Sequence, residues 1–305
     1  MAVRHATEED LSALLQLNST EIWQDPFYWK SIDQQQRWED GMWWADPELL
    51  AWYYSVLQAT GGGILVVESD DEIIGELDYV QSYDDITGFS GNRLHIIWLL
   101  THPDYRQQGI AQQLLQFLSS STDLPIWVEP EDNRSDALYQ KFGKQVFSIS
   151  NWQLDIHDMP ASLPDDRLEY NVLSLESVLE LSSSYSLLLG RYYAPNYDSL
   201  QLTMSDPVYA YMWGNTRKPE VFEYQLTTTN VYAIMTQYPR IWVNHGYDPQ
   251  ELQRILGAIS LTLFEQGFDK IYIQLYNHPT LSKILQNLHY ICTIADDPVY
   301  QLYPL

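Results

Sequence analysis

A short run of residues between an apolar segment and a helical pattern has the composition of an anion-binding turn. The run is Arg106-Gln107-Gln108-Gly109-Ile110-Ala111, which fits the pattern R/Q-x-x-G-x-G/A. The first turn of a helix leaves backbone N–H groups without intrahelical partners and carries a partial positive charge. Gly109 and Ala111 have little or no side chain, so an anion can approach the backbone closely. The sequence therefore predicts that this turn binds a pyrophosphate.

The segments on both sides of this turn make the pattern specific. Residues 94–101 read LHIIWLLT, which is typical of a largely apolar strand. Apolar residues at positions 110, 111, 114, 115 and 118 recur at helical spacing, so we expect an amphipathic helix over Ile110–Leu118. The turn thus lies where a strand ends and a helix begins, which is the geometry that anion binding needs.

The rest of the first half alternates strands and helices. A strand should lead into a helix within Val3–Leu17, where Thr7 is a good N-cap and Asp10 stands in the capping-box position. Ser69-Asp70-Asp71 separates two apolar runs and indicates a hairpin. The other expected elements are strands at Ile64–Glu68, Ile73–Val80, Ile126–Glu129 and Val146–Ile156, and a helix at Ser135–Phe142. The fold class expected is α/β (α+β), with a mixed central sheet flanked by helices.

The order of elements repeats beyond a polar, proline-bearing linker at Pro160–Asp166. Arg106 precedes Ile126 by 20 residues, and Glu251 precedes Ile271 by the same distance. The matching elements of the second half are a strand and helix within Tyr170–Leu181, strands within Val231–Val243, a helix at Pro249–Gln266, a strand at Ile271–Leu275 and a helix at Asn277–Leu288. We therefore predict two similar units in tandem, residues 1–158 and 165–305, although ordinary α/β rhythm explains part of the match.

The charge of the chain limits its partners. Of 305 residues, 41 are acidic and 16 are basic, so the formal net charge is −25. Such a surface repels phosphate backbones and anionic lipids, so we expect neither a nucleic-acid partner nor a membrane. It can attract a cationic amine, although a general adaptation for solubility explains the charge equally well.

Cysteine and histidine usage bounds the compartment and the metal content. Cys292 is the only cysteine, which excludes an internal disulfide and a cysteine-rich metal site. His245, His278 and His289 lack metal-site spacing, so no metal is expected. The N-terminal residues lack the apolar core of a signal peptide, and no run of 18 apolar residues occurs. These features favour a cytoplasmic enzyme.

The run from 94 to 118 closely resembles the cofactor signature of the GNAT acetyltransferase superfamily. A second signature follows the strand at 126–129, where Asn133 and then Ala137-Leu138-Tyr139-Gln140-Lys141-Phe142-Gly143 resemble that family's Asn…Leu-Tyr-x-Lys-x-Gly run. Two departures occur: Asn133 stands one residue nearer to the Leu-Tyr pair, and Lys144 replaces the usual aromatic residue. The resemblance covers about residues 2–156. It implies the GNAT fold and acetyl-CoA as co-substrate.

The resemblance also implies how acetyl-CoA is held. The molecule lies in a cleft where two neighbouring strands splay apart, and its pantetheine arm pairs with backbone groups like an added strand. Its pyrophosphate binds the amides of the turn, and the substrate amine attacks the thioester directly. The residues implied in cofactor binding are Leu99, Leu100, Thr101, Arg106, Gln107, Gln108, Gly109, Ile110, Ala111, Gln112 and Asn133.

Two side chains are implied in the chemistry. His95 lies eleven residues before Arg106, where members of the family place a catalytic Glu or His, and its expected pKa of about 6.5 suits a general base. A structural histidine is the alternative, with Glu76 and Asp78 as reserve bases. Tyr139 stands where the family keeps a tyrosine close to the departing sulfur, and a role in packing is its alternative. A backbone amide near Leu99 or Leu100 would meet the oxyanion.

Six of the eleven tryptophans fall between Trp23 and Trp52, the region that roofs the acceptor site in the GNAT layout. Such faces can hold a cationic or aromatic acceptor, or pack against the second half or another subunit. In the second half, the stretch from Glu251 to Leu256 matches the anion-binding turn but has no glycine and begins with a carboxylate. We expect a degenerate unit that has lost the cofactor and shapes the acceptor pocket or mediates dimerisation.

The leading hypothesis is an N-acetyltransferase that moves the acetyl group of acetyl-CoA to a primary amine of a small molecule. A second hypothesis within the same enzyme class is acetylation of a protein N-terminus or lysine. A third, from another class, is an acyl-CoA-binding module without chemistry. A homodimer is a further expectation.

Overall fold

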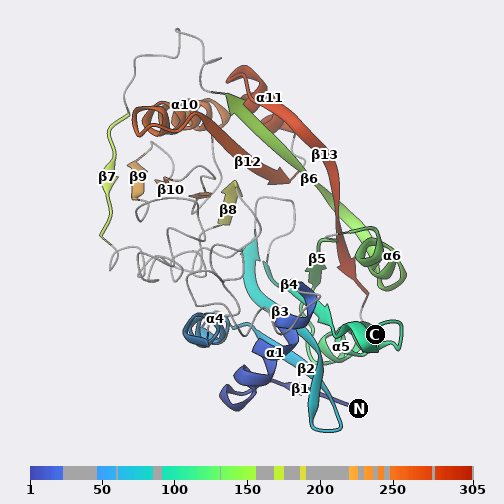
Figure 1. Ribbon diagram of the computed structural model, residues 1–305. Helices are drawn as coiled ribbons and strands as arrows, with labels where there is room; N and C mark the ends of the chain where they lie inside the picture. The colour runs from blue at the N-terminus through green and yellow to red at the C-terminus, as the bar shows by residue number, and fades with distance from the viewer. Residues whose placement is uncertain are drawn as a thin grey trace.

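The computed structural model describes residues 1–22, 47–59, 61–84, 91–130, 132–155, 168–174, 186–189, 220–225, 230–235, 240–243, 248–276 and 279–303. Among these residues the strands form one sheet of eight strands and one of five, with helices against them (Figure 1). The larger sheet has the order β1-β2-β3-β4-β5-β13-β6-β12. This is the mixed sheet flanked by helices that the sequence predicts.

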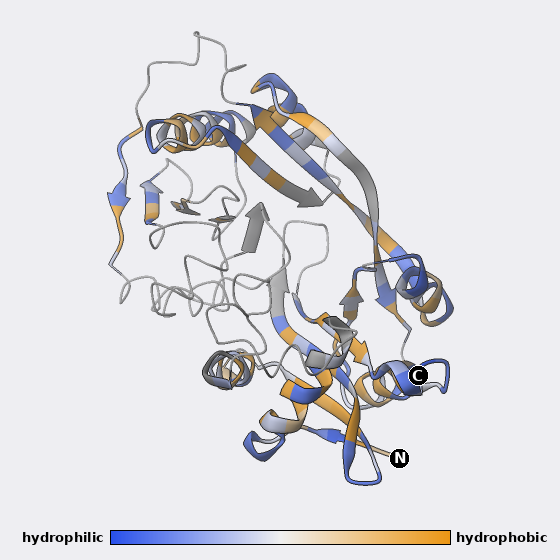
Figure 2. Cartoon of the chain, viewed as in Figure 1, coloured by the Kyte–Doolittle hydropathy of each residue, from blue (hydrophilic) through white to orange (hydrophobic). Residues whose placement is uncertain are grey.

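The N-terminal part of the larger sheet is an antiparallel run of four strands. These are β1 (Ala2–His5), β2 (Gly63–Ser69), β3 (Glu72–Asp84) and β4 (Gly91–Thr101). The hairpin between β2 and β3 turns at Asp70 and Asp71, whose φ angles are +53° and +64°. Aspartate tolerates this left-handed conformation better than most residues, which is why the predicted turn forms here. β2 is mostly apolar, and the turn that connects it to β3 is polar (Figure 2).

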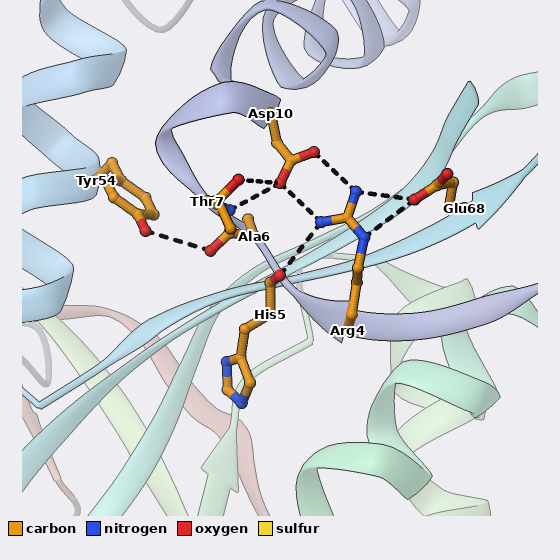
Figure 3. Close-up of polar contacts among 7 residues, drawn as sticks. All are labelled: Arg4, His5, Ala6, Thr7, Asp10, Tyr54 and Glu68. Atoms are coloured by element: carbon orange, nitrogen blue, oxygen red, sulfur yellow. Dashed lines mark hydrogen bonds and ion pairs between the residues drawn. The ribbon is translucent and has the colours of Figure 1, made fainter. Parts of the chain in front are cut away.

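A polar cluster fastens the start of the first helix to the sheet. Thr7 and Asp10 form the capping box that their spacing predicts, and α1 (Leu11–Ile22) follows. The guanidinium group of Arg4 lies between two carboxylates, 2.7 Å from Asp10 and 2.8 Å from Glu68 on β2 (Figure 3). The hydrogen bond from Arg4 is the main cause that lowers the pKa of Asp10 to about 2. Asp10 therefore serves both as cap and as ion-pair partner.

Helices cover both faces of these strands. On one face, α1 and α4 (Pro47–Ala59) pack over a core that includes Leu14, Leu57 and Val66. On the other face, α5 (Ile110–Ser120) buries Ile110, Leu114, Leu115 and Leu118, four of the apolar positions predicted for it. A methyl group added to Gly75 on β3 would overlap Cγ2 of Ile110. Glycine at this position therefore lets the start of α5 lie directly on the sheet.

The larger sheet becomes mixed at β5 (Ile126–Val128), which runs parallel to β4. The chain continues through α6 (Asn133–Phe142) into β6 (Gly143–Asp155), a single long strand. In the second half, β12 (Lys270–Tyr276), α11 (Pro279–Asn287) and β13 (Ile291–Leu302) follow one another in the same order of strand, helix and strand. This order matches that of β5, α6 and β6, while the tandem arrangement of two similar units stays a prediction.

Two long strands are exchanged between the halves. β13 lies between β5 and β6, pairing antiparallel with both, and β6 also pairs antiparallel with β12. Figure 1 shows β6 and β13 side by side from the region of α6 to that of α11. Each half therefore contributes a strand to the part of the sheet that the other half begins.

The hydrophobic cores show the same exchange. Trp152 and Leu154 of β6 lie in the core formed by β12, α10 (Pro249–Glu265) and α11. Tyr300 and Leu302 of β13 lie in the core beneath α5 and α6. Removing either strand would thus expose apolar surface in the opposite half.

The remaining described strands form the five-stranded sheet. They are β7 (Asn171–Val172), β8 (Ser186–Leu189), β9 (Val221–Gln225), β10 (Asn230–Ile234) and β11 (Arg240–Val243), in the order β7-β9-β10-β11-β8. The predicted linker and the boundary between 158 and 165 lie outside the described residues, as do residues 175–181 of the expected helix. The division into domains 1–158 and 165–305 therefore stays a prediction.

Across the described ranges, no helix combines the length and the apolar character needed to cross a membrane. Within those same ranges, His, Cys, Asp and Glu side chains form no group of three or more suited to a metal ion. The expectation of a metal-free site stays a prediction.

Candidate active site

β4 continues past the point where its pairing with β5 ends, and we call this end of pairing the divergence of the two strands. Pairing between them covers only Leu94 to Ile96 on β4 and ends at the pair Ile96 and Val128. On its other edge β4 stays paired with β3 as far as Thr101. Leu99, Leu100 and Thr101 therefore lie beyond the stretch of β4 that pairs with β5, which suits backbone pairing with an extended ligand.

An irregularity in β4 lies next to this divergence. Asp78 pairs with Trp98 while Tyr79 pairs with Ile96, so Ile97 is an extra residue on β4. A β-bulge of this kind bends a strand and re-aims its side chains, and such bulges recur beside active sites. The bulge at Ile97 directly follows the last β4 residue that pairs with β5.

The turn after β4 has the backbone shape of an anion site. His102 Nδ1 accepts a hydrogen bond from the amide of Asp104 at 3.2 Å, and a 3₁₀ turn spans Pro103–Tyr105. The φ angles of Gln107 and Gly109 are +63° and +82°. Left-handed residues in such a turn aim successive N–H groups to one side and create an anion-binding concavity. A Cβ atom on Gly109 would meet no atom within 4 Å, so this side of the turn is open.

The start of α5 completes this concavity. Gly109 is the N-cap of α5, and the amide of Gln113 hydrogen-bonds to the Gly109 carbonyl at 3.0 Å. The amides of Ile110, Ala111 and Gln112 precede that bond, in the part of a helix where backbone donors lack intrahelical acceptors. The first turn of α5 carries no acidic residue. Its amides can therefore face an anion without a competing carboxylate.

The matching helix of the second half has the opposite character. The side chain of Asp248 caps α10 by accepting a hydrogen bond from the Gln250 amide at 2.9 Å, and Glu251 adds a carboxylate in the first turn. Negative charge at this end would repel a pyrophosphate. The contrast with α5 supports the sequence-based expectation that this half does not hold the cofactor.

His95 lies on β4 just before the bulge, opposite Val80 on β3 and Trp127 on β5. Its side chain is 0% exposed, and its ring meets that of Trp127 edge-on at 6.0 Å between centroids. Burial, followed by the charge of Arg93, lowers the pKa of His95 well below its usual value. The imidazole is therefore neutral at pH 7, the form that can accept a proton.

Arg93 and Trp127 form the wall next to His95. The guanidinium carbon of Arg93 lies 3.9 Å from the ring centroid of Trp127, a cation–π contact, and Arg93 is itself buried. No local sequence motif points to either residue. Side chains alternate between the two faces along β4 and β5, and this alternation places Arg93, His95 and Trp127 on one face of the sheet. This pattern is the sequence signal that could have identified Arg93 and Trp127.

Two buried carboxyl groups lie on β3, on the same face as His95. Glu76 accepts a hydrogen bond of 2.6 Å from the Asn18 amide group of α1, and Asp78 accepts one of 2.8 Å from the Tyr53 hydroxyl of α4. Burial and the neighbouring Asp78 raise the pKa of Glu76, and burial raises the pKa of Asp78 to about 7. Asp78 is thus partly protonated at neutral pH, and two helices hold the two carboxyl groups.

The Asp78→Asn substitution should make stability less dependent on pH. The carboxyl of Asp78 titrates near 3.8 in the unfolded chain and near 7 in the folded one, so the folded state holds more protons between these values. Its stabilising contribution is complete below pH 3.8 and is lost as pH rises through about 7, by up to about 4 kcal/mol. Urea unfolding at pH 4.5 and 7.5 measures this dependence. Between the two pH values, the free energy of unfolding should fall less for the variant than for the wild type.

The Tyr53→Phe substitution is the matched comparison. The Tyr53 hydroxyl lowers the pKa of Asp78 by hydrogen bonding, so its removal should extend the loss of stability to higher pH. If the free energy of unfolding changes equally with pH in the wild type and the Asp78→Asn variant, Asp78 does not titrate in this range.

The second signature forms α6. The side chain of Asp132 caps the helix by accepting hydrogen bonds from the amides of Arg134 and Ser135. Asn133 is the first helical residue and is exposed, whereas Tyr139 is buried and lies in the core of the first half. Tyr139 lies six positions after Asn133 in the helix, so nearly two helical turns separate the two residues.

Most of the tryptophan-rich region, residues 23–46, lies outside the described residues. The described aromatic residues of α4 turn inward. Trp52 and Tyr54 pack against the core beneath α1 and α4, and the Tyr54 hydroxyl donates to the Ala6 carbonyl at 3.2 Å. For these residues packing within the first half explains their presence.

Comparison with known proteins identifies the family and the fold. Residues 10–144 match the model of the acetyltransferase (GNAT) family. The fold is similar to a GCN5-related N-acetyltransferase from Kribbella flavida, with a TM-score of 0.59 and 14% identity over 98% of this chain and 71% of that one. It is also similar to one from Anabaena variabilis, with a TM-score of 0.55 and 15% identity over 98% and 72% of the two chains.

No curated protein sequence matches the chain. At identities of 14% and 15%, the two solved structures establish the fold alone. The family model adds the sequence match, and it spans the diverging strand, the turn at Gly109 and the α6 signature. The chain therefore carries, at residues 10–144, a domain of the acetyltransferase (GNAT) family.

Proposed function

We propose that this domain transfers the acetyl group of acetyl-CoA to a primary amine of a small molecule. The observation that carries the proposal is the turn at Gln107–Gln112, which offers backbone amides to an anion at the end of the diverging strand β4. Acetyl-CoA combines an extended pantetheine arm with a pyrophosphate, and these two features match the two parts of the site. When bound, acetyl-CoA supplies the activated acetyl group.

In this proposal, backbone groups and one side chain of the domain bind different parts of acetyl-CoA. Backbone groups of Leu99–Thr101 pair with the pantetheine arm, and the turn amides hold the pyrophosphate. Arg106, whose side chain is exposed, adds positive charge beside the turn.

The transfer itself needs one proton acceptor and one hydrogen-bond donor. The amine nitrogen forms the amide bond, the C–S bond breaks, and the proton of the amine passes to the neutral imidazole of His95. The Tyr139 hydroxyl donates a hydrogen bond to the departing sulfur. An amide of the bulged strand near Leu99 or Leu100 meets the oxyanion. The net charge of −25 favours a cationic acceptor such as a polyamine, an amino sugar or an amino acid.

One observation favours a non-catalytic acyl-CoA-binding module as the second candidate. His95 is 0% exposed, and Glu76 and Asp78 are 1% and 2% exposed. Among the described residues, these candidate bases are therefore screened from solvent. An enzyme needs a path from the acceptor to one of them, whereas a binding module does not.

The second half is proposed to be a GNAT-like unit that has lost its cofactor. The repeated order of strand, helix and strand and the acidic start of α10 support this proposal. In this proposal the second half shapes the acceptor site and completes the sheet of the first.

Calorimetry and turnover test these alternatives together. We expect CoA and acetyl-CoA to bind, and free CoA to appear when an amine from a metabolite panel is added. Turnover on peptides in place of metabolites would move the assignment to protein acetylation. Binding without turnover on any amine would leave the binding module, and no heat of binding would reject both. Because Cys292 is exposed, a thiol-reactive readout needs a protein blank.

A further inference from the structure

Tyr300 belongs to the last strand of the second half, but its side chain lies in the core of the first half. On β13 it pairs with Val128 of β5 on one side and with Gln145 of β6 on the other. It is 5% exposed, and its ring centroid is 6.5 Å from that of Tyr139, at an interplanar angle of 45°. The two tyrosines thus meet inside one core, although they come from opposite halves.

The hydroxyl group of Tyr300 joins two side chains of α6. It donates a hydrogen bond of 2.6 Å to Asp136 Oδ1 and accepts one of 3.3 Å from Gln140 Nε2. Gln140 Nε2 also donates to Asp136 Oδ2 at 2.8 Å. The three side chains form a closed ring of hydrogen bonds. Since Asp136 and Gln140 lie one turn apart and flank Tyr139, the ring fixes the rotation of the helix segment that carries Tyr139.

Electrostatics keep this ring intact over a wide pH range. Burial, together with the hydrogen bond to Asp136, raises the pKa of Tyr300. The phenol therefore stays protonated and continues to donate, and a short hydrogen bond to a carboxylate is among the stronger ones in proteins. The backbone adds a second link, because the amide of Tyr303 donates to the carbonyl of Phe142 at 2.8 Å, at the end of α6.

We propose that Tyr300 is a positioning residue for acetyl transfer, which holds α6 through Asp136 and Gln140 so that the Tyr139 hydroxyl is aimed at the departing sulfur. This inference rests on the proposed function. It makes the second half part of the catalytic apparatus even where that half binds no cofactor. A group misplaced by about 1 Å can cost a large factor in rate while leaving substrate binding unchanged.

A double-mutant cycle tests the proposal. Tyr300→Phe keeps the aromatic side chain but removes the hydroxyl group, and we expect it to lower kcat about tenfold. The dissociation constant for CoA by calorimetry should stay within about twofold, because the turn at Gly109 is untouched. In a Tyr139→Phe background the same change should lower kcat no further, since residues that act through one another are not additive. A purely structural role would give the same loss in both backgrounds.

Controls separate the possible failures. Tyr303→Phe, an exposed position on the same chain segment whose backbone bond is retained, should leave kcat unchanged. Asp136→Ala breaks the same hydrogen bond from the helix side. This variant replaces Tyr300→Phe in the test if Tyr300→Phe does not fold. Unchanged kcat in both Tyr300→Phe and Asp136→Ala, or equal losses with and without Tyr139, overturns the positioning role alone. A wild type that neither binds CoA nor releases it overturns the proposed function as well.

Discussion

Replacing His95 by Gln should lower kcat/KM for the amine by a factor of about 10² to 10⁴, the usual contribution of a general base. The expected loss follows from the neutral, buried imidazole just before the bulge of β4. CoA affinity should not change, because His95 lies on the strand and not in the turn. The activity of the variant should rise at alkaline pH, where a growing fraction of the amine is already deprotonated and needs no base.

The pH profile also identifies the base. Because burial and Arg93 lower the pKa of His95, the wild-type enzyme should stay active into mildly acidic solution. An acidic limb near pH 7 that disappears in Asp78→Asn would assign the role to Asp78 instead. His289→Gln, at an exposed position after α11, is the matched control and should leave the rate unchanged. Full activity in His95→Gln would remove the histidine from the mechanism.

Replacing Gly109 by Val should raise the dissociation constant of CoA by at least about tenfold, corresponding to 1.4 kcal/mol or more. Gly109 has a φ angle of +82° in the turn that we assign to the pyrophosphate, and a Cβ atom there would meet nothing within 4 Å. A branched side chain both strains this backbone and occupies the space that the anion needs. Calorimetry with CoA measures the change directly.

Gly267 provides the matched control for backbone strain. It follows α10 with a φ angle of +92°, and a Cβ atom there also meets nothing within 4 Å. Gly267→Val should therefore lose a similar amount of thermal stability, while its affinity for CoA stays that of the wild type. If the two variants bind CoA equally well, the turn at Gly109 does not hold the pyrophosphate.

Local signals predicted the part of the fold that local interactions determine. Thr7 and Asp10 form the expected cap, Asp70 and Asp71 form the expected turn, and the apolar positions of Ile110–Leu118 are mostly buried as the helix α5. The turn at Gly109 has the left-handed backbone that its glycine allows. In each case the residue type restricts φ and ψ or selects one buried face. A few neighbouring residues in the sequence are therefore sufficient to predict the local structure.

Features that depend on distant partners were not predicted. The apolar pattern of β13 indicates a strand, but nothing in residues 291–302 specifies that it pairs with β5 in the other half. Likewise, the sequence indicates Glu76 and Asp78 as reserve bases, but their burial beside Asn18 and Tyr53 depends on two helices. The bulge at Ile97 depends on the register between two strands. Pairing partners and burial are properties of the assembled fold, which periodicity alone does not encode.

The position of β13 has a consequence for biosynthesis. β5 and β6 leave the ribosome well before residues 291–302 are made, so the slot between them waits with unpaired backbone N–H and C=O groups. Such edges recruit foreign strands and promote aggregation until they are filled. These edges of the nascent first half therefore stay open to other chains while the second half is translated. The maturation of the first half is completed by a late, long-range closure, which contact-order arguments place among the slow steps of folding.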